Sequence, residues 1–81
     1  MTEVTLYAKP GCHLCEEARA VLDGVRAETP FELREVDVSL DPALHRRYGE
    51  RIPVVEVGGQ ELFEYHVEPR VLKERLGTVG T

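Results

Sequence analysis

The chain has 81 residues, of which 42% are hydrophobic and 31% are charged, and this balance predicts a small globular domain rather than a disordered chain. The formal net charge of −5 argues against nucleic-acid binding, which usually needs a basic face. No apolar run is long enough to cross a membrane, and the first residues lack the basic and apolar regions of a signal peptide. We therefore expect a cytoplasmic protein that does not bind membranes.

A strand and a helix are predicted at the start of the chain. Residues 3–8 alternate in polarity, with Val4, Leu6 and Ala8 on one side, which is typical of a strand. A Lys-Pro-Gly sequence then interrupts the strand. Residues 13–26 place their apolar side chains on one stripe of a helix.

The middle of the chain predicts a second strand and a short helix. Residues 31–39 are rich in β-forming side chains, but the apolar side changes between Leu33 and Val36. We expect a strand that contains a bulge or is partly buried on both faces. Asp41 can cap the helix that follows, and Gly49 is suited to its end.

The last third of the chain predicts a β-hairpin and a third helix. The sequences IPVVEV and QELFEY flank Gly58-Gly59, a pair that favours a tight hairpin turn. Pro69 is suited to the first turn of the last helix, and Gly77 to its end. The apolar residues of this helix are expected to face inward: Val71, Leu72 and Leu76.

The predicted order is β-α-β-α-β-β-α, an α/β arrangement. The first two strands and the helix between them can form a right-handed parallel unit, and the last two strands form an antiparallel hairpin. A four-stranded mixed sheet with helices on both faces packs these elements most simply. We expect residues 1–77 to form one domain and residues 78–81 to form a flexible C-terminal tail.

Both cysteines lie near the junction between the first predicted strand and the first predicted helix. Their three-residue spacing brings Cys12 and Cys15 close enough for a disulfide. Free amide groups and the helix dipole at a helix N-terminus favour a thiolate, and thiols in such settings can have a pKa of roughly 3.5–7.5. Cys12 occupies this position, whereas Cys15 lies on the apolar stripe. One attacking and one resolving sulfur are what disulfide exchange requires.

Two other interpretations of the cysteine pair remain open. A zinc site needs more ligands, and the three histidines do not have the usual His-x₃₋₅-His spacing: His13, His45 and His66. A half-site completed by a second chain, or two inert core thiols, would also satisfy the pattern. A Cys-x-x-Cys sequence beside a βαβ unit favours a redox pair, so we expect no metal ligands in this chain.

The sequence YAKPGCHLC after a strand, RIPVVEV farther along, and the element order together resemble the thioredoxin fold, and most closely small glutaredoxin-like proteins. This resemblance covers nearly the whole chain. It implies that Cys12 is the nucleophile, Cys15 the resolving cysteine, and Pro53 a cis-proline beside the disulfide. It also implies that the backbone of Ile52 pairs with the substrate backbone, and that Lys9 contacts a carboxylate of glutathione.

The chain departs from the glutaredoxin pattern at several positions. The loop Gly-Gly-x-Asp, which holds glutathione in that family, reads EYHVEP here, and His13-Leu14 replace Pro-Tyr between the cysteines. A protonated His13 can stabilise the neighbouring thiolate, or it can be an exposed residue with little effect. Arg51 can attract a carboxylate of glutathione or of an acidic partner, or it can lie on a solvated face. Lys9 can equally be an exposed loop lysine.

The sequence therefore predicts a monomeric dithiol–disulfide oxidoreductase that reduces protein or small-molecule disulfides through a mixed disulfide. No tightly bound cofactor is expected, and an upstream thiol system, either glutathione or a reductase, must reduce the protein again. Two alternatives are a dedicated electron donor for one reductase and a metal-binding or iron–sulfur-binding module.

Overall fold

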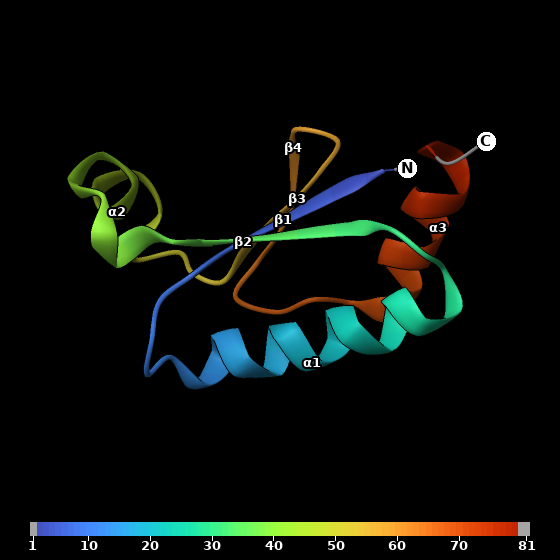
Figure 1. Ribbon diagram of the computed structural model, residues 1–81, viewed down its shortest axis with the longest axis horizontal. Coiled ribbons are helices and arrows are strands. Elements are labelled where there is room, and N and C mark those ends of the chain that lie inside the picture. The colour runs from blue at the N-terminus through green and yellow to red at the C-terminus, as the bar shows by residue number, and fades with distance from the viewer. Residues whose placement is uncertain (1, 80–81) are drawn as a thin grey trace.

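A computed structural model describes residues 2–79, and within them the strands and helices follow the predicted order (Figure 1). The strands are β1 (Glu3–Ala8), β2 (Glu32–Asp37), β3 (Val54–Val57) and β4 (Gln60–Glu64). The helices are α1 (His13–Glu28), the 3₁₀ turn η1 (Val38–Leu40), α2 (Pro42–Tyr48) and α3 (Pro69–Val79).

The four strands form one mixed sheet in the order β2-β1-β3-β4. β1 pairs with β2 in parallel, whereas the β1–β3 and β3–β4 pairs are antiparallel. The pairs Ala8↔Asp37 and Tyr7↔Val54 place the C-terminal end of β1 beside the end of β2 and the start of β3. Loops that follow β1 and precede β3 therefore meet at one end of the sheet.

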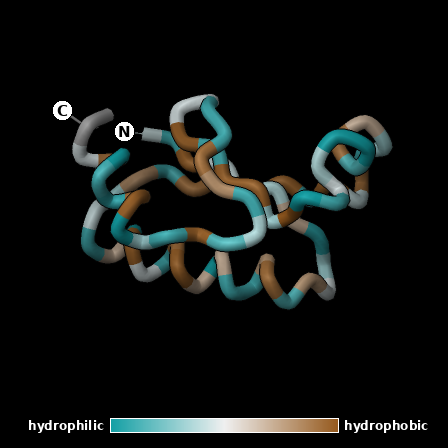
Figure 2. The backbone as a smooth tube through the Cα atoms, turned by 180° about the vertical axis from the view of Figure 1, so that it is seen from behind, coloured by the Kyte–Doolittle hydropathy of each residue, from teal (hydrophilic) through white to brown (hydrophobic). Residues whose placement is uncertain are grey.

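The hydrophobic core lies between one face of the sheet and the helices α1 and α3. The alternation of β1 turns its three buried side chains to this face, and hydrophobic and hydrophilic residues alternate along the coil of α1 (Figure 2). Full burial of each large apolar side chain contributes about 1.5–3 kcal/mol. The buried residues of β1, α1 and α3 are Val4, Leu6, Ala8, Cys15, Ala18, Leu22, Val25, Leu72 and Leu76.

The opposite face of the sheet is covered at one end by α2. The Tyr48 ring stacks on the Tyr7 ring of β1, with centroids 4.3 Å apart and planes 20° from parallel. Asp41 caps α2 by accepting hydrogen bonds from the backbone N–H groups of Ala43 and Leu44, as its place before Pro42 predicts. The prediction of helices on both faces is thus confirmed, as is the four-stranded mixed sheet.

The bulge that the sequence allows in the second strand is absent from β2. All six residues of β2 pair with β1 without a shift in register. Leu33 and Val36 are each half-buried, so burial on both faces explains the change of apolar side. The irregularity lies instead in the hairpin, between Val55 and Glu56, where β3 pairs with β4.

The last helix differs from the sequence prediction in two respects. It continues through Val79, past the Gly77 at which we expected it to end, so part of the expected tail is helical. Residues 80 and 81 lie outside the described residues. The prediction that Val71 faces inward is wrong, because this residue is 39% exposed. No helix in residues 2–79 is both long and apolar enough to span a bilayer.

Candidate active site

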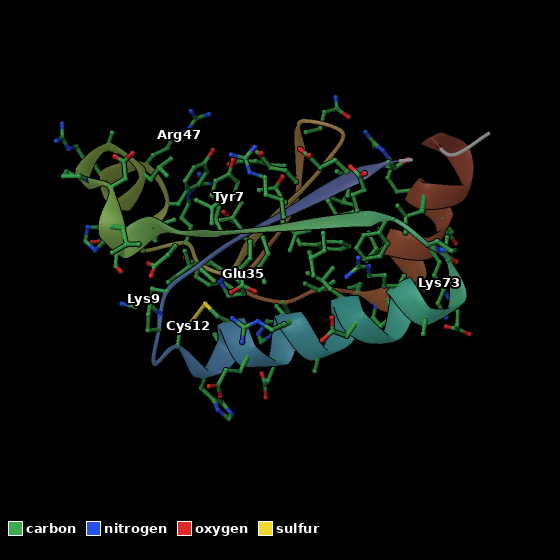
Figure 3. The ribbon with its side chains drawn as sticks, in the orientation of Figure 1. Tyr7, Lys9, Cys12, Glu35, Arg47 and Lys73 are labelled. Carbon is green, nitrogen blue, oxygen red and sulfur yellow. A yellow bond between two sulfur atoms is a disulfide. The ribbon has the colours of Figure 1, made fainter. Side chains whose placement is uncertain are left out.

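A disulfide joins Cys12 and Cys15 at the start of α1, with Cα atoms 5.2 Å apart (Figure 3). Cys12 is the N-cap residue of the helix, and its Sγ accepts a hydrogen bond from the backbone N–H of Cys15 at 3.2 Å. Cys12 is half-buried, whereas Cys15 is completely buried in the core. The two sulfurs therefore differ in access to solvent, as the sequence predicted.

The loop between β1 and α1 sets this position. It comprises Lys9, Pro10 and Gly11, and the φ angle of Gly11 is +76°, in the left-handed region that favours glycine. The loop reverses the chain at the end of β1, so that Cys12 starts a helix that packs under the sheet (Figure 1).

The second loop at this end of the sheet contains a cis peptide bond between Ile52 and Pro53. Pro53 comes directly before β3, whose first residue pairs with Tyr7 near the end of β1. Both residues of the bond are buried, and the Pro53 carbonyl accepts a hydrogen bond from the Tyr65 N–H at 2.8 Å. The cis bond that the resemblance implied is confirmed, while its contact with a substrate stays a prediction.

Lys9 lies on the loop that leads to Cys12 (Figure 3). It lines a cavity of about 250 Å³ on the β2 side of this loop, together with Arg19 and Glu35. Arg19 and Glu35 form a bidentate ion pair, with Nε–Oε1 and Nη2–Oε2 distances of 2.7 and 2.8 Å. Lys9 is exposed and forms no ion pair within residues 2–79, so it is the available cation of this cavity.

Arg51 is engaged within the protein. Its guanidinium forms ion pairs with Glu61 and Glu64 of β4, each at 3.0 Å, and lies 5.4 Å from the centre of the Tyr48 ring. The hydrogen bond to Glu61, followed by that to Glu64, raises the pKa of Arg51 above its ordinary value. Its role in substrate binding stays a prediction, and this side chain would have to exchange partners to fulfil it.

His13 is the first residue of α1, and its side chain is 83% exposed. Its Nε2 lies 3.5 Å from Oε1 of Glu17, one turn farther along the helix. The structure thus brings the imidazole close to a carboxylate on the helix surface. The tuning of Cys12 by His13 stays a prediction.

Tyr7 lies on the sheet face opposite α1 (Figure 3). Its hydroxyl donates a hydrogen bond to Oε1 of Glu56 at 2.9 Å. Burial, and secondly this bond, raise the pKa of Tyr7 to about 12.

The sequence marked the segment EYHVEP as a departure from the glutathione loop, but it did not predict that residues 65–67 line a cavity. Tyr65 and Val67 line a cavity of about 230 Å³ with Leu14, the residue directly before Cys15. The φ angle of Tyr65 is +68°, a value that bulky residues rarely adopt, so no sequence signal marks this turn. Among residues 2–79, no group of three or more His, Cys, Asp or Glu side chains is arranged to hold a metal ion.

Comparison with known proteins agrees with this geometry. The family model described as "Glutaredoxin-like domain (DUF836)" matches residues 3–78. The solution NMR structure of protein Ne2328 from Nitrosomonas europaea is 30% identical, with a TM-score of 0.79 over 91% of this chain and 89% of that chain. The uncharacterized protein Rv0508 of Mycobacterium tuberculosis is 28% identical over 76 residues, which are 88% of this chain and 78% of that protein.

A mutant thioredoxin from Halobacterium salinarum shares the fold. It is 20% identical, with a TM-score of 0.69 over 95% of this chain and 73% of that chain. The match to a glutaredoxin-like domain and the disulfide-bonded cysteine pair suggest a redox function. With a family model that spans nearly its whole length, the chain belongs to the glutaredoxin-like domain family (DUF836) and has the thioredoxin-like fold.

Proposed function

We propose that this protein is a dithiol–disulfide oxidoreductase. The observation that carries the proposal is the inequality of the two bonded sulfurs, because Cys12 is half-buried at the N-cap of α1 and Cys15 is completely buried. An accessible sulfur can attack a substrate, whereas a buried partner can react only with the sulfur beside it.

The reaction starts from the reduced protein. The Cys12 thiolate attacks one sulfur of the substrate disulfide, that bond breaks, and the other substrate sulfur leaves as a thiolate that takes up a proton. The resulting mixed disulfide joins Cys12 to the substrate. Cys15 then loses its proton and attacks Cys12 Sγ, which releases the second substrate thiol and forms the disulfide seen here. Two electrons pass from the protein to the substrate.

The backbone of the chain assists the attacking sulfur. The N–H of Cys15 donates to Cys12 Sγ at 3.2 Å, and the first turn of a helix leaves its N–H groups without partners inside the helix. These dipoles stabilise a negative charge on sulfur. They therefore favour the thiolate form of Cys12, which is the form that attacks the substrate disulfide.

The remaining roles belong to the same proposal. Ile52 and Pro53, at the same end of the sheet as the cysteine loop, would hold the substrate backbone, and Lys9 would contact a substrate carboxylate. Glutathione or a protein reductase would supply the two electrons that restore the dithiol, without a tightly bound cofactor.

Two serine variants test this proposal. With Cys15→Ser, the mixed disulfide cannot be resolved, so mass spectrometry should find a covalent adduct between Cys12 and a disulfide substrate. With Cys12→Ser, neither adduct nor turnover should form, which makes it the matched control. Absence of an adduct on Cys15→Ser, together with no reduction of insulin or small disulfides by the wild type, would contradict the proposal.

A further inference from the structure

A groove lies between the first half of α1 and the segment after β4. Its cavity has a volume of about 230 Å³. Leu14, which lies between the two cysteines in sequence, is the lining residue nearest to them along the chain, and neither cysteine lines the cavity itself. Five of the seven lining residues are apolar or aromatic, and the polar two are Glu17 and His66. The apolar or aromatic members are Leu14, Ala18, Val21, Tyr65 and Val67.

Tyr65 forms one wall of this groove in an unusual backbone conformation. Its φ angle is +68°, and the N–H of His66 donates to the carbonyl of Glu64 at 2.8 Å, which closes a three-residue turn around Tyr65. A positive φ is unfavourable for a bulky residue, whereas a glycine adopts it without this cost. Such a residue therefore suggests a local requirement for its side chain.

The backbone and the side chain of Tyr65 each donate one hydrogen bond to the segment 50–53. The N–H of Tyr65 donates to the Pro53 carbonyl at 2.8 Å, and its hydroxyl donates to the Glu50 carbonyl at 3.1 Å. One residue therefore ties the end of β4 to both ends of the segment 50–53, which includes the cis peptide bond. Tyr65 as a whole remains 43% exposed, as expected for a residue that also faces a groove.

We propose that Tyr65 is a specificity-determining residue, and that the groove which it forms takes one apolar side chain next to the cysteine of a protein disulfide. This inference rests on the proposed oxidoreductase function. A cavity of about 230 Å³ lies below the range of roughly 300–1,000 Å³ that is usual for whole small molecules, so it is suited to a single side chain.

The charges around the groove favour an apolar protein segment over glutathione. Glu17 lines the groove, and the exposed Glu68 follows the segment that forms its wall. Glutathione carries two carboxylates and one ammonium group, so its net charge is negative and these glutamates disfavour it. Lys9, the available cation near the cysteines, lines a different cavity on the β2 side. An uncharged, apolar side chain meets no such repulsion and buries its surface against Leu14 and Val21.

Competition kinetics with matched substrates test the inference. Two disulfide-linked peptides would differ only in the residue before the cysteine, leucine or aspartate, and a third would carry glutathione in mixed disulfide. We expect the wild type to reduce the leucine peptide with a kcat/KM at least about tenfold above either of the others. Tyr65→Gly tolerates the positive φ but lacks the ring. It should raise the KM of the leucine peptide, so that the ratio of kcat/KM values falls to less than about threefold.

Further variants distinguish an effect of the groove on substrate preference from a general effect of mutation on activity. Tyr65→Phe keeps the ring and should keep the preference, and Val71→Ala, an exposed position on α3, should leave the ratio unchanged. Should Tyr65→Gly fail to fold, Val21→Asp places a carboxylate in the groove and should also reduce the ratio. Equal kcat/KM values in the wild type, or preference for the glutathione mixed disulfide, would overturn the inference and leave the oxidoreductase function standing. Absence of turnover with all three substrates would overturn both.

Discussion

The hydroxyl of Tyr7 donates to Glu56 across two neighbouring strands, on the face of the sheet away from the disulfide. The folded protein retains the phenol proton up to about pH 12, whereas the unfolded chain loses it near pH 10. The contribution of this group to folding stability is therefore complete below about pH 10 and is lost as the pH rises through 12.

The variant Tyr7→Phe tests this ionisation directly. A spectrophotometric titration of the phenolate should lose its step near pH 12, because that step belongs to Tyr7. At neutral pH the variant should unfold with a free energy lower by about 1 kcal/mol, since a half-buried hydrogen bond is lost. A step near pH 12 that persists in Tyr7→Phe would contradict this assignment.

Sequence reasoning worked well for residues whose role depends on near neighbours. The position of Cys12 at a helix N-terminus followed from a strand, a Pro-Gly turn and an apolar stripe, all of them local signals. The role of Tyr65 depends instead on acceptors in Glu50 and Pro53, which lie more than ten residues away. No local pattern predicts that a tyrosine adopts a positive φ in order to reach them.

The short helix α2 depends on its cap. Asp41 Oδ1 accepts from the N–H of Ala43 at 2.9 Å and of Leu44 at 3.4 Å, and a seven-residue helix has few other hydrogen bonds to hold it. We expect Asp41→Ala to lower the free energy of unfolding by about 1 kcal/mol in urea denaturation. Asp41→Asn retains the acceptor and should retain most of this stability. Equal losses in the two variants would show that the cap does not act through this hydrogen bond.

The edge strand β4 is held by Arg51 as well as by its ladder with β3. The guanidinium joins Glu61 and Glu64 on one strand, while its Nη2 also donates to the Arg47 carbonyl of α2 at 3.5 Å. We expect Arg51→Gln to accelerate amide hydrogen exchange in β4. An edge strand is hydrogen-bonded to a neighbouring strand on one side only, so the loss of its ion pairs makes local opening easier. Arg19→Gln breaks a comparable ion pair at β2 and should leave β4 unchanged. Equal protection of β4 in both variants would contradict this role.

The elements themselves were largely predictable, and their ends were less so. Periodicity located every strand and each longer helix, because burial of one face imposes a period of two or of about 3.6. Gly77 was expected to end α3, but its φ angle is not positive and the helix continues to Val79. Val71 matched the apolar pattern and is nevertheless 39% exposed, because periodicity alone does not give the width of the face that a helix buries.

At the scale of the molecule, the order of the strands assembles the site. β1 lies between β2 and β3, so the loop to Cys12 and the loop with Pro53 leave the sheet at the same end. The sequence predicted a mixed sheet, and the resemblance to glutaredoxin-like proteins related Cys12 to Pro53. The ion pairs of Arg51 could not be predicted, because its partners lie 10 and 13 residues away on a strand whose neighbours depend on the whole fold.

The central claim is that Cys12 and Cys15 exchange two electrons with thiols in solution. Equilibration of the wild type in mixtures of reduced and oxidised glutathione, followed by acid quenching and mass spectrometry, tests it most directly. We predict two interconverting species that differ by two hydrogen atoms, with a reversible midpoint that is absent in Cys12→Ser. A protein that stays reduced at every ratio, or whose cysteines carry only separate glutathione adducts without a disulfide between them, would contradict the claim.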